Sequence, residues 1–97
     1  MAQQRVLGLN DKLAEKQYRT ALYYIRYKAD DSAILYLKDL ASTYPRAKVV
    51  PEALVTLITI YKRLGYTEDI RETCIYLRRF HPDAPRVESA CRSVVAS

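Results

Sequence analysis

YIRYKADDSAILYLKDLASTYP, residues 24–45, aligns without a gap with YKRLGYTEDIRETCIYLRRFHP, residues 61–82, at an offset of 37 residues. The matched positions include Tyr24 with Tyr61, Arg26 with Arg63, Leu40 with Leu77, and Pro45 with Pro82. A period in the thirties with two helices per unit is typical of an α-solenoid, in which each unit covers the apolar face of its neighbour. The repeat therefore predicts an all-α fold built from like helical hairpins.

Apolar residues recur at spacings of three and four on both sides of the repeated stretch, which is the pattern of amphipathic helices. The stripes predict helices over residues 11–28, 31–43, 48–64, 67–80 and 85–95. The first ten residues lack such a stripe, so we expect a flexible segment over 1–10 and a helical domain over 11–97. This domain divides into a hairpin over 11–45, a hairpin over 48–82 and a capping helix over 85–95.

Several residues predict where these helices begin and end. Asp30 or Asp31 and Thr67 have side-chain oxygens that can accept a hydrogen bond from a free backbone N–H, so we expect them to cap the second and fourth helices. Gly65 follows the third helix and can adopt the left-handed conformation that ends it. Lys28 stands at the equivalent position of the first unit.

The composition excludes several classes of function. With two glycines the chain has no phosphate-binding loop, and with one histidine and two distant cysteines it has poor material for a catalytic or metal site. We therefore predict that the protein is not an enzyme and needs no cofactor or metal. No apolar run approaches the ~20 residues of a membrane span, although peripheral association with a membrane stays open. The net charge of +5 is spread along the chain and would favour an acidic protein surface, anionic lipid headgroups or nucleic acid, without choosing among them.

Cys74 and Cys91 lie on apolar stripes of adjacent predicted helices. We interpret them as two buried small hydrophobic residues, which is the usual role of a free cysteine in a core. The alternative is a disulfide between the last two helices, and this alternative requires an oxidising compartment.

The repeat pattern resembles the tetratricopeptide repeat. Ala21 and Ala33 fall at the small positions of its two helices, and Leu54, Leu57, Tyr61, Gly65 and Leu77 fall at matching sites of the second unit. This resemblance implies two tetratricopeptide-like hairpins plus a C-terminal capping helix, which together form a fragment of an α-solenoid.

The sequence also resembles the C-terminal repeats of the BamD family, the tetratricopeptide-repeat lipoproteins of the bacterial outer-membrane β-barrel assembly machine. The resemblance rests on Val50–Leu54 (VPEAL), Ile60–Tyr61, Leu64–Tyr66 and the earlier Tyr44–Pro45. It implies a non-catalytic scaffold at the periplasmic side of the outer membrane. Its partners would be other protein subunits, including the periplasmic domains of an outer-membrane barrel protein. The lipidated cysteine of that family has no counterpart here, so the resemblance does not extend to lipid anchoring.

By repeat position, the concave face of the stack is lined by the first helix of each unit. The candidate protein-binding residues on this face are Tyr18, Leu22, Arg26, Thr59, Lys62 and Arg63. Tyrosine and arginine are enriched at binding hot spots, so we expect these residues to hold an acidic or extended segment of a partner. The alternative is that they are ordinary solvated residues of a helix surface.

Two other functions remain open at this point. One is a tetratricopeptide-type adaptor that binds peptides in the cytoplasm. The other is a small basic nucleic-acid-binding protein, in which some of the nine tyrosines would stack on bases. The nucleic-acid alternative is favoured least, because most of the tyrosines recur at core-facing or inter-helix positions. The sequence leaves the oligomeric state open.

Overall fold

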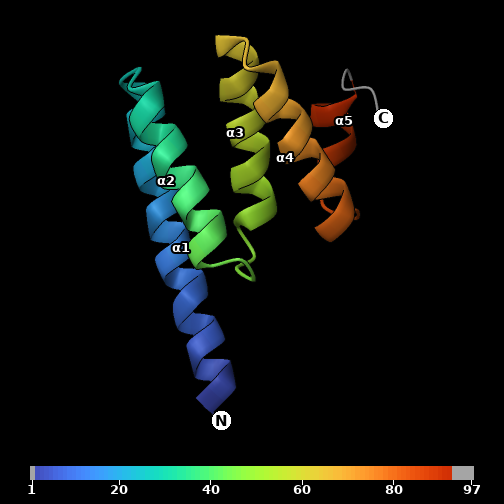
Figure 1. Cartoon of the computed structure of the whole chain (residues 1–97). Helices are drawn as coiled ribbons and strands as arrows, with labels where there is room; N and C mark the ends of the chain where they lie inside the picture. The colour runs from blue at the N-terminus through green and yellow to red at the C-terminus, as the bar shows by residue number, and fades with distance from the viewer. Residues whose placement is uncertain (1, 93–97) are drawn as a thin grey trace.

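The computed structural model describes the backbone of residues 2–92 and the side chains of residues 10–92. It contains the helices α1 (Ala2–Arg26), α2 (Asp30–Thr43), α3 (Val50–Leu64), α4 (Thr67–Phe80) and α5 (Val87–Cys91). Helices α1 and α2 form one antiparallel hairpin, α3 and α4 form the next, and α5 lies beside the second hairpin (Figure 1). Residues 2–92 contain no strand, so the predicted all-α fold of two hairpins and a capping helix is confirmed.

The offset of 37 residues seen in the sequence is present in the backbone. Tyr24 O accepts from Ala29 N at 2.8 Å, as Tyr61 O accepts from Tyr66 N at 2.9 Å; Leu40 O accepts from Tyr44 N at 2.9 Å, as Leu77 O accepts from His81 N at 2.8 Å. The bond from Ala53 N to Val49 O likewise recurs from Ala90 N to Arg86 O, each at 2.8 Å. Helix α5 therefore occupies the position in its unit that α3 occupies in the preceding one.

The core runs through the whole stack. Small residues with no exposed surface, Ala14, Ala21 and Ala33, allow α1 and α2 to approach closely. Helix α3 is the most buried element, because it packs against α2, α4 and α5. Each large aliphatic side chain that is buried fully contributes about 1.5–3 kcal/mol relative to an exposed one. Packing of α3 is therefore the main link between the two hairpins.

The ends of the helices agree only partly with the sequence-based expectations. Gly65 has φ 78° and caps α3 in the left-handed conformation, as predicted. The predicted side-chain caps are wrong, because Ala29 and Tyr66 occupy the N-cap positions and neither side chain makes a capping hydrogen bond. Asp30 and the other acidic residues at these helix starts lie in the first turn, where the helix dipole stabilises negative charge.

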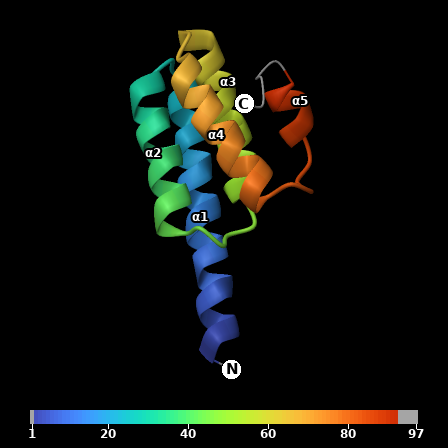
Figure 2. The same ribbon diagram turned by 45° about the vertical axis from the view of Figure 1, so that its right-hand side comes forward.

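The outer ends of the chain also require corrections. Helix α1 begins at Ala2, so the helix start predicted at residue 11 is too late and residues 2–10 are helical. In Figures 1 and 2, this part of α1 extends past the end of α2. Helix α5 begins at Val87 instead of residue 85, and the predicted residues 93–95 lie outside the described part of the chain. The domain boundary after residue 10 stays a prediction.

Candidate protein-binding surface

Two pairs of large exposed side chains lie at the C-terminal end of α1. Leu22 and Arg26 form one i, i+4 pair, and Tyr23 forms the pair beside it with Tyr27, which directly follows the last residue of α1. Leu22 is 40% exposed, Tyr23 56% and Tyr27 65%. These four residues, hereafter the α1 stripe, include two of the predicted binding residues. A continuous stripe of leucine, tyrosine and arginine can bury apolar area and also donate hydrogen bonds.

Stacked aromatic rings support the α1 stripe. The ring of Tyr23 lies 4.6 Å from that of Tyr27 and 5.8 Å, edge-on, from that of Tyr24. Tyr24 in turn stacks on Tyr36 of α2 at 5.3 Å. A side-chain hydrogen bond with Tyr36 is the main cause that raises the pKa of Tyr24 above its ordinary value. The rings therefore form one packed cluster that spans both helices of the first hairpin.

Tyr23 and Tyr27 were not among the binding residues predicted from the sequence. The expectation that most of the tyrosines occupy core or inter-helix positions is correct for Tyr61, at 4% exposed, whereas Tyr23 and Tyr27 face solvent. The signal was present in the run Tyr23–Tyr27 (YYIRY), because five consecutive large residues on a helix cannot all face the core.

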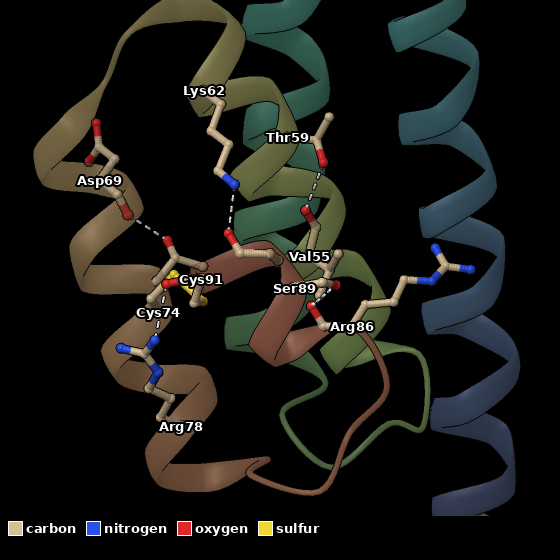
Figure 3. Close-up of a disulfide and its surroundings, with 11 residues drawn as sticks. Val55, Thr59, Lys62, Asp69, Cys74, Arg78, Arg86, Ser89 and Cys91 are labelled. Carbon is tan, nitrogen blue, oxygen red and sulfur yellow. Dashed lines mark hydrogen bonds between the residues drawn. A yellow bond between two sulfur atoms is a disulfide. The ribbon is translucent and has the colours of Figure 1, made fainter. Parts of the chain in front are cut away.

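The predicted residues on α3 are engaged in contacts within the molecule. Lys62 Nζ donates to Ala90 O of α5 at 2.7 Å, and Thr59 Oγ1 donates to Val55 O of its own helix at 3.2 Å (Figure 3). Arg63 Nη2 forms an ion pair with Asp30 Oδ1 at the start of α2, at 2.5 Å. Lys62 thus connects α3 to α5, and Arg63 connects α3 to α2.

Tyr18 links the two halves of the predicted surface. Its hydroxyl lies 3.0 Å from Thr56 Oγ1, so a hydrogen bond joins α1 to α3. Among the described residues, Arg26 has no hydrogen-bond or ion-pair partner. The predicted residues therefore lie on two helices that the Tyr18–Thr56 hydrogen bond connects. Of the predicted residues on α1, Leu22 and Arg26 keep large exposed side chains available to another molecule.

A disulfide and two charged hydrogen bonds fasten α5 to the second hairpin. Cys74 of α4 and Cys91 of α5 are bonded, with Cα atoms 5.8 Å apart, and neither has exposed surface (Figure 3). Arg78 Nη2 donates to Cys91 O at 3.0 Å, in addition to the bond from Lys62. The interpretation of two free cysteines is therefore wrong, although both are buried. A helix of five residues is too short to be stable alone, so these links hold it in place.

The described residues contain neither a candidate metal site nor a candidate membrane span. No group of three or more His, Cys, Asp or Glu side chains lies close enough together to hold a metal ion within the part of the chain that was described. None of the described helices has the length and apolar character needed to cross a membrane.

Comparison with known proteins agrees with this arrangement. A family model described as YfiO, outer membrane lipoprotein, matches residues 1–76. The chain is also 35% identical over 72 residues to the outer membrane protein assembly factor BamD of Vibrio cholerae. The match covers 74% of this chain and 30% of that relative, so the chain corresponds to about a third of the relative's length. No solved structure gives a significant match.

Proposed function

Because the chain belongs to the YfiO family of outer membrane lipoproteins, we propose that it is a non-catalytic scaffold in the assembly of outer-membrane β-barrel proteins. Its place of action would be the periplasmic side of the outer membrane. Its partners would be other protein subunits, among them the periplasmic domains of a barrel protein. The family match over residues 1–76 is the observation that carries this proposal.

The Cys74–Cys91 disulfide supports the location. Disulfides persist in oxidising compartments such as the bacterial periplasm and are rare in the cytosol. The disulfide thus favours the envelope over the cytoplasmic adaptor.

The α1 stripe supports the mode of action. We assign partner binding to the predicted residues Tyr18, Leu22, Arg26, Thr59, Lys62 and Arg63, and we add Tyr23 and Tyr27. Exposed tyrosine and arginine side chains carry a large part of the energy of many interfaces. In this arrangement Arg26 would pair with an acidic group of the partner, while Leu22 and the two tyrosine rings would bury apolar surface. The α3 residues would define the edge of the interface.

Co-isolation from outer membranes tests the proposal. The tagged full chain is mixed with detergent-extracted outer membranes, and the barrel subunit of the assembly machine is quantified by mass spectrometry. We expect its enrichment with the unaltered chain and a loss of about tenfold with the Tyr23→Ala/Arg26→Ala variant, because hot-spot truncations typically cost 1 kcal/mol or more each. The matched control is Arg71→Ala, which removes an exposed arginine of α4.

Two outcomes would contradict the proposal. One is equal recovery of the barrel subunit with the unaltered chain and with the tag alone. The other is recovery that the Tyr23→Ala/Arg26→Ala variant and the Arg71→Ala control reduce to the same extent. Equal melting temperatures of the three proteins would show that the variants differ only at their surfaces.

A further inference from the structure

A groove lies between α2, α3 and α4, and none of the described side chains of α1 or α5 lines it. Its volume is about 440 Å³, which is within the range of pockets that enclose small ligands or a few side chains. Leu54, Leu57 and Tyr61 of α3 form an apolar floor, with Ala41 of α2 and Tyr76 of α4 at the sides. This groove is separate from the α1 stripe, since the two share no residue.

The two walls of the groove carry opposite charges. Asp69 and Glu72 lie one turn apart on α4, and Lys38 lies on α2. Among the described residues, neither of these carboxylates has an ion-pair partner, because the two ion pairs there are Arg63 with Asp30 and Arg71 with Glu68. The chain has a net charge of +5, so this acidic wall is a local patch whose charge is opposite in sign to that of the chain as a whole.

The electrostatic effect of the two carboxylates reaches the floor of the groove. The pKa of Tyr61 is raised above its ordinary value by burial first, and then by the charges of Asp69 and Glu72. The wall of α4 therefore disfavours a further negative charge in the groove. A phosphate-bearing ligand such as a nucleic acid would be repelled there, whereas a cationic side chain would be attracted.

We propose that this groove binds a peptide segment of another protein in which apolar side chains adjoin an arginine or lysine. The apolar side chains contact the floor made by Leu54, Leu57 and Tyr61. The basic side chain pairs with Asp69 and Glu72 on α4, and Lys38 on α2 faces the acidic or carbonyl end of the segment. The opposite charges of the two walls thus fix the direction in which the segment lies across the groove.

This inference extends beyond the proposed scaffold role, since it places a second binding surface in a groove that shares no residue with the α1 stripe. A chain with both surfaces would hold two segments at once, one on the α1 stripe and one in the groove. Failure of either surface leaves the other unaffected, because their residues do not overlap.

Binding of labelled peptides to the full chain tests the groove. The first probe is a short fluorescein-labelled peptide with a central leucine pair, an arginine on one side and a glutamate on the other. The second probe has glutamate in place of the arginine. Fluorescence anisotropy is expected to show about tenfold tighter binding of the arginine probe, which is the effect of one favourable charge pair replaced by a repulsive one.

Charge reversal of the wall supplies the matched comparison. Glu72→Lys is expected to weaken the arginine probe by about tenfold and to strengthen the glutamate probe. Glu68→Lys makes the same change on the same helix outside the groove, and it should alter both affinities less than twofold or so. Arg26→Ala should leave both affinities unchanged, which separates this surface from the α1 stripe.

Several results would overturn the proposal. They are equal binding of the two probes, equal effects of Glu72→Lys and Glu68→Lys, and no binding of the arginine probe at millimolar concentration. Amide chemical-shift changes confined to α1 would place the probe elsewhere. Self-association that Glu72→Lys abolishes, seen by sedimentation, would show that a second copy of the chain fills the groove instead.

Discussion

Lys28 and Gly65 end the first helices of the two hairpins in the same left-handed conformation, with φ values of 60° and 78°. This conformation is unfavourable for residues with a Cβ atom and costs glycine nothing. We expect Lys28→Gly to stabilise the protein by about 1 kcal/mol and Gly65→Ala to destabilise it by a similar amount. A Cβ atom at Gly65 would meet no atom within 4 Å, so the effect there is conformational.

Urea unfolding of the two variants measures these changes. The prediction requires opposite shifts of the midpoint at unchanged slope. A Lys28→Gly variant with an unchanged or lower midpoint would show that the lysine side chain compensates for its backbone conformation.

The raised pKa of Tyr61 predicts how stability depends on alkaline pH. The folded chain holds the phenol proton more tightly than the unfolded chain, so the contribution of Tyr61 is fully present below its unfolded pKa of about 10. It is lost as the pH rises from there through the folded pKa. Urea midpoints between about pH 9 and pH 11.5 should therefore fall less steeply for Tyr61→Phe than for the unaltered chain. Parallel pH profiles would contradict this account.

At the scale of the elements, the disulfide takes the position of an apolar pair in the preceding repeat. Cys74 and Cys91 correspond, at an offset of 37, to Leu37 and Leu54, which are both in the core. A cross-link between residues 17 apart is expected to contribute about 3 kcal/mol by restricting the unfolded chain. The disulfide thus secures a short helix where the first unit relies on packing alone.

Replacement of both cysteines tests this role of the disulfide. Cys74→Ala/Cys91→Ala should lose about 3 kcal/mol or more, because it removes the cross-link and leaves a cavity. Cys74→Leu/Cys91→Leu restores the apolar pair of the first unit and should lose less. Urea unfolding with and without a thiol reductant makes the comparison, and only the unaltered chain should respond to the reductant. A reductant-insensitive unaltered chain would show that the cross-link contributes nothing.

The sequence predicted the helices better than their ends. The repeat at an offset of 37 and the apolar stripes fixed the number and order of helices, because both depend on local spacing. The predicted N-caps were wrong because the helices begin earlier than expected. Thr67, for example, is the first residue of α4, and Tyr66 holds the N-cap position. The start of α1 was missed because residues 2–10 lack the apolar stripe by which the other helices were recognised.

The candidate site was predictable only in part, because the contacts that decide it are not local. Arg26 and Arg63 are equivalent in the repeat, yet Arg63 pairs with Asp30 while Arg26 is free among the described residues. Arg63 finds its partner on α2, the helix that precedes α3 in the stack, and this contact joins residues that are far apart in the sequence. The groove depends on three helices at once, and no spacing along the chain could have indicated it.

At the scale of the whole molecule, the stack separates its binding surfaces by helix. The α1 stripe lies at the C-terminal end of α1, while the groove lies between α2, α3 and α4. Each unit of a repeat stack packs only on its neighbours, so its other faces stay exposed. Such a stack can therefore bind several partners on separate faces. This separation suits a scaffold that brings subunits together.

Direct titration tests the central proposal, that this chain binds the periplasmic domains of a barrel-assembly subunit through α1. Isothermal titration calorimetry would use the full chain and the purified periplasmic domains. We predict a one-to-one complex with Kd on the order of micromolar, weakened about tenfold by Tyr23→Ala/Arg26→Ala and unchanged by Arg71→Ala. Absence of binding at concentrations near 1 mM, with all three proteins folded, would contradict the proposal.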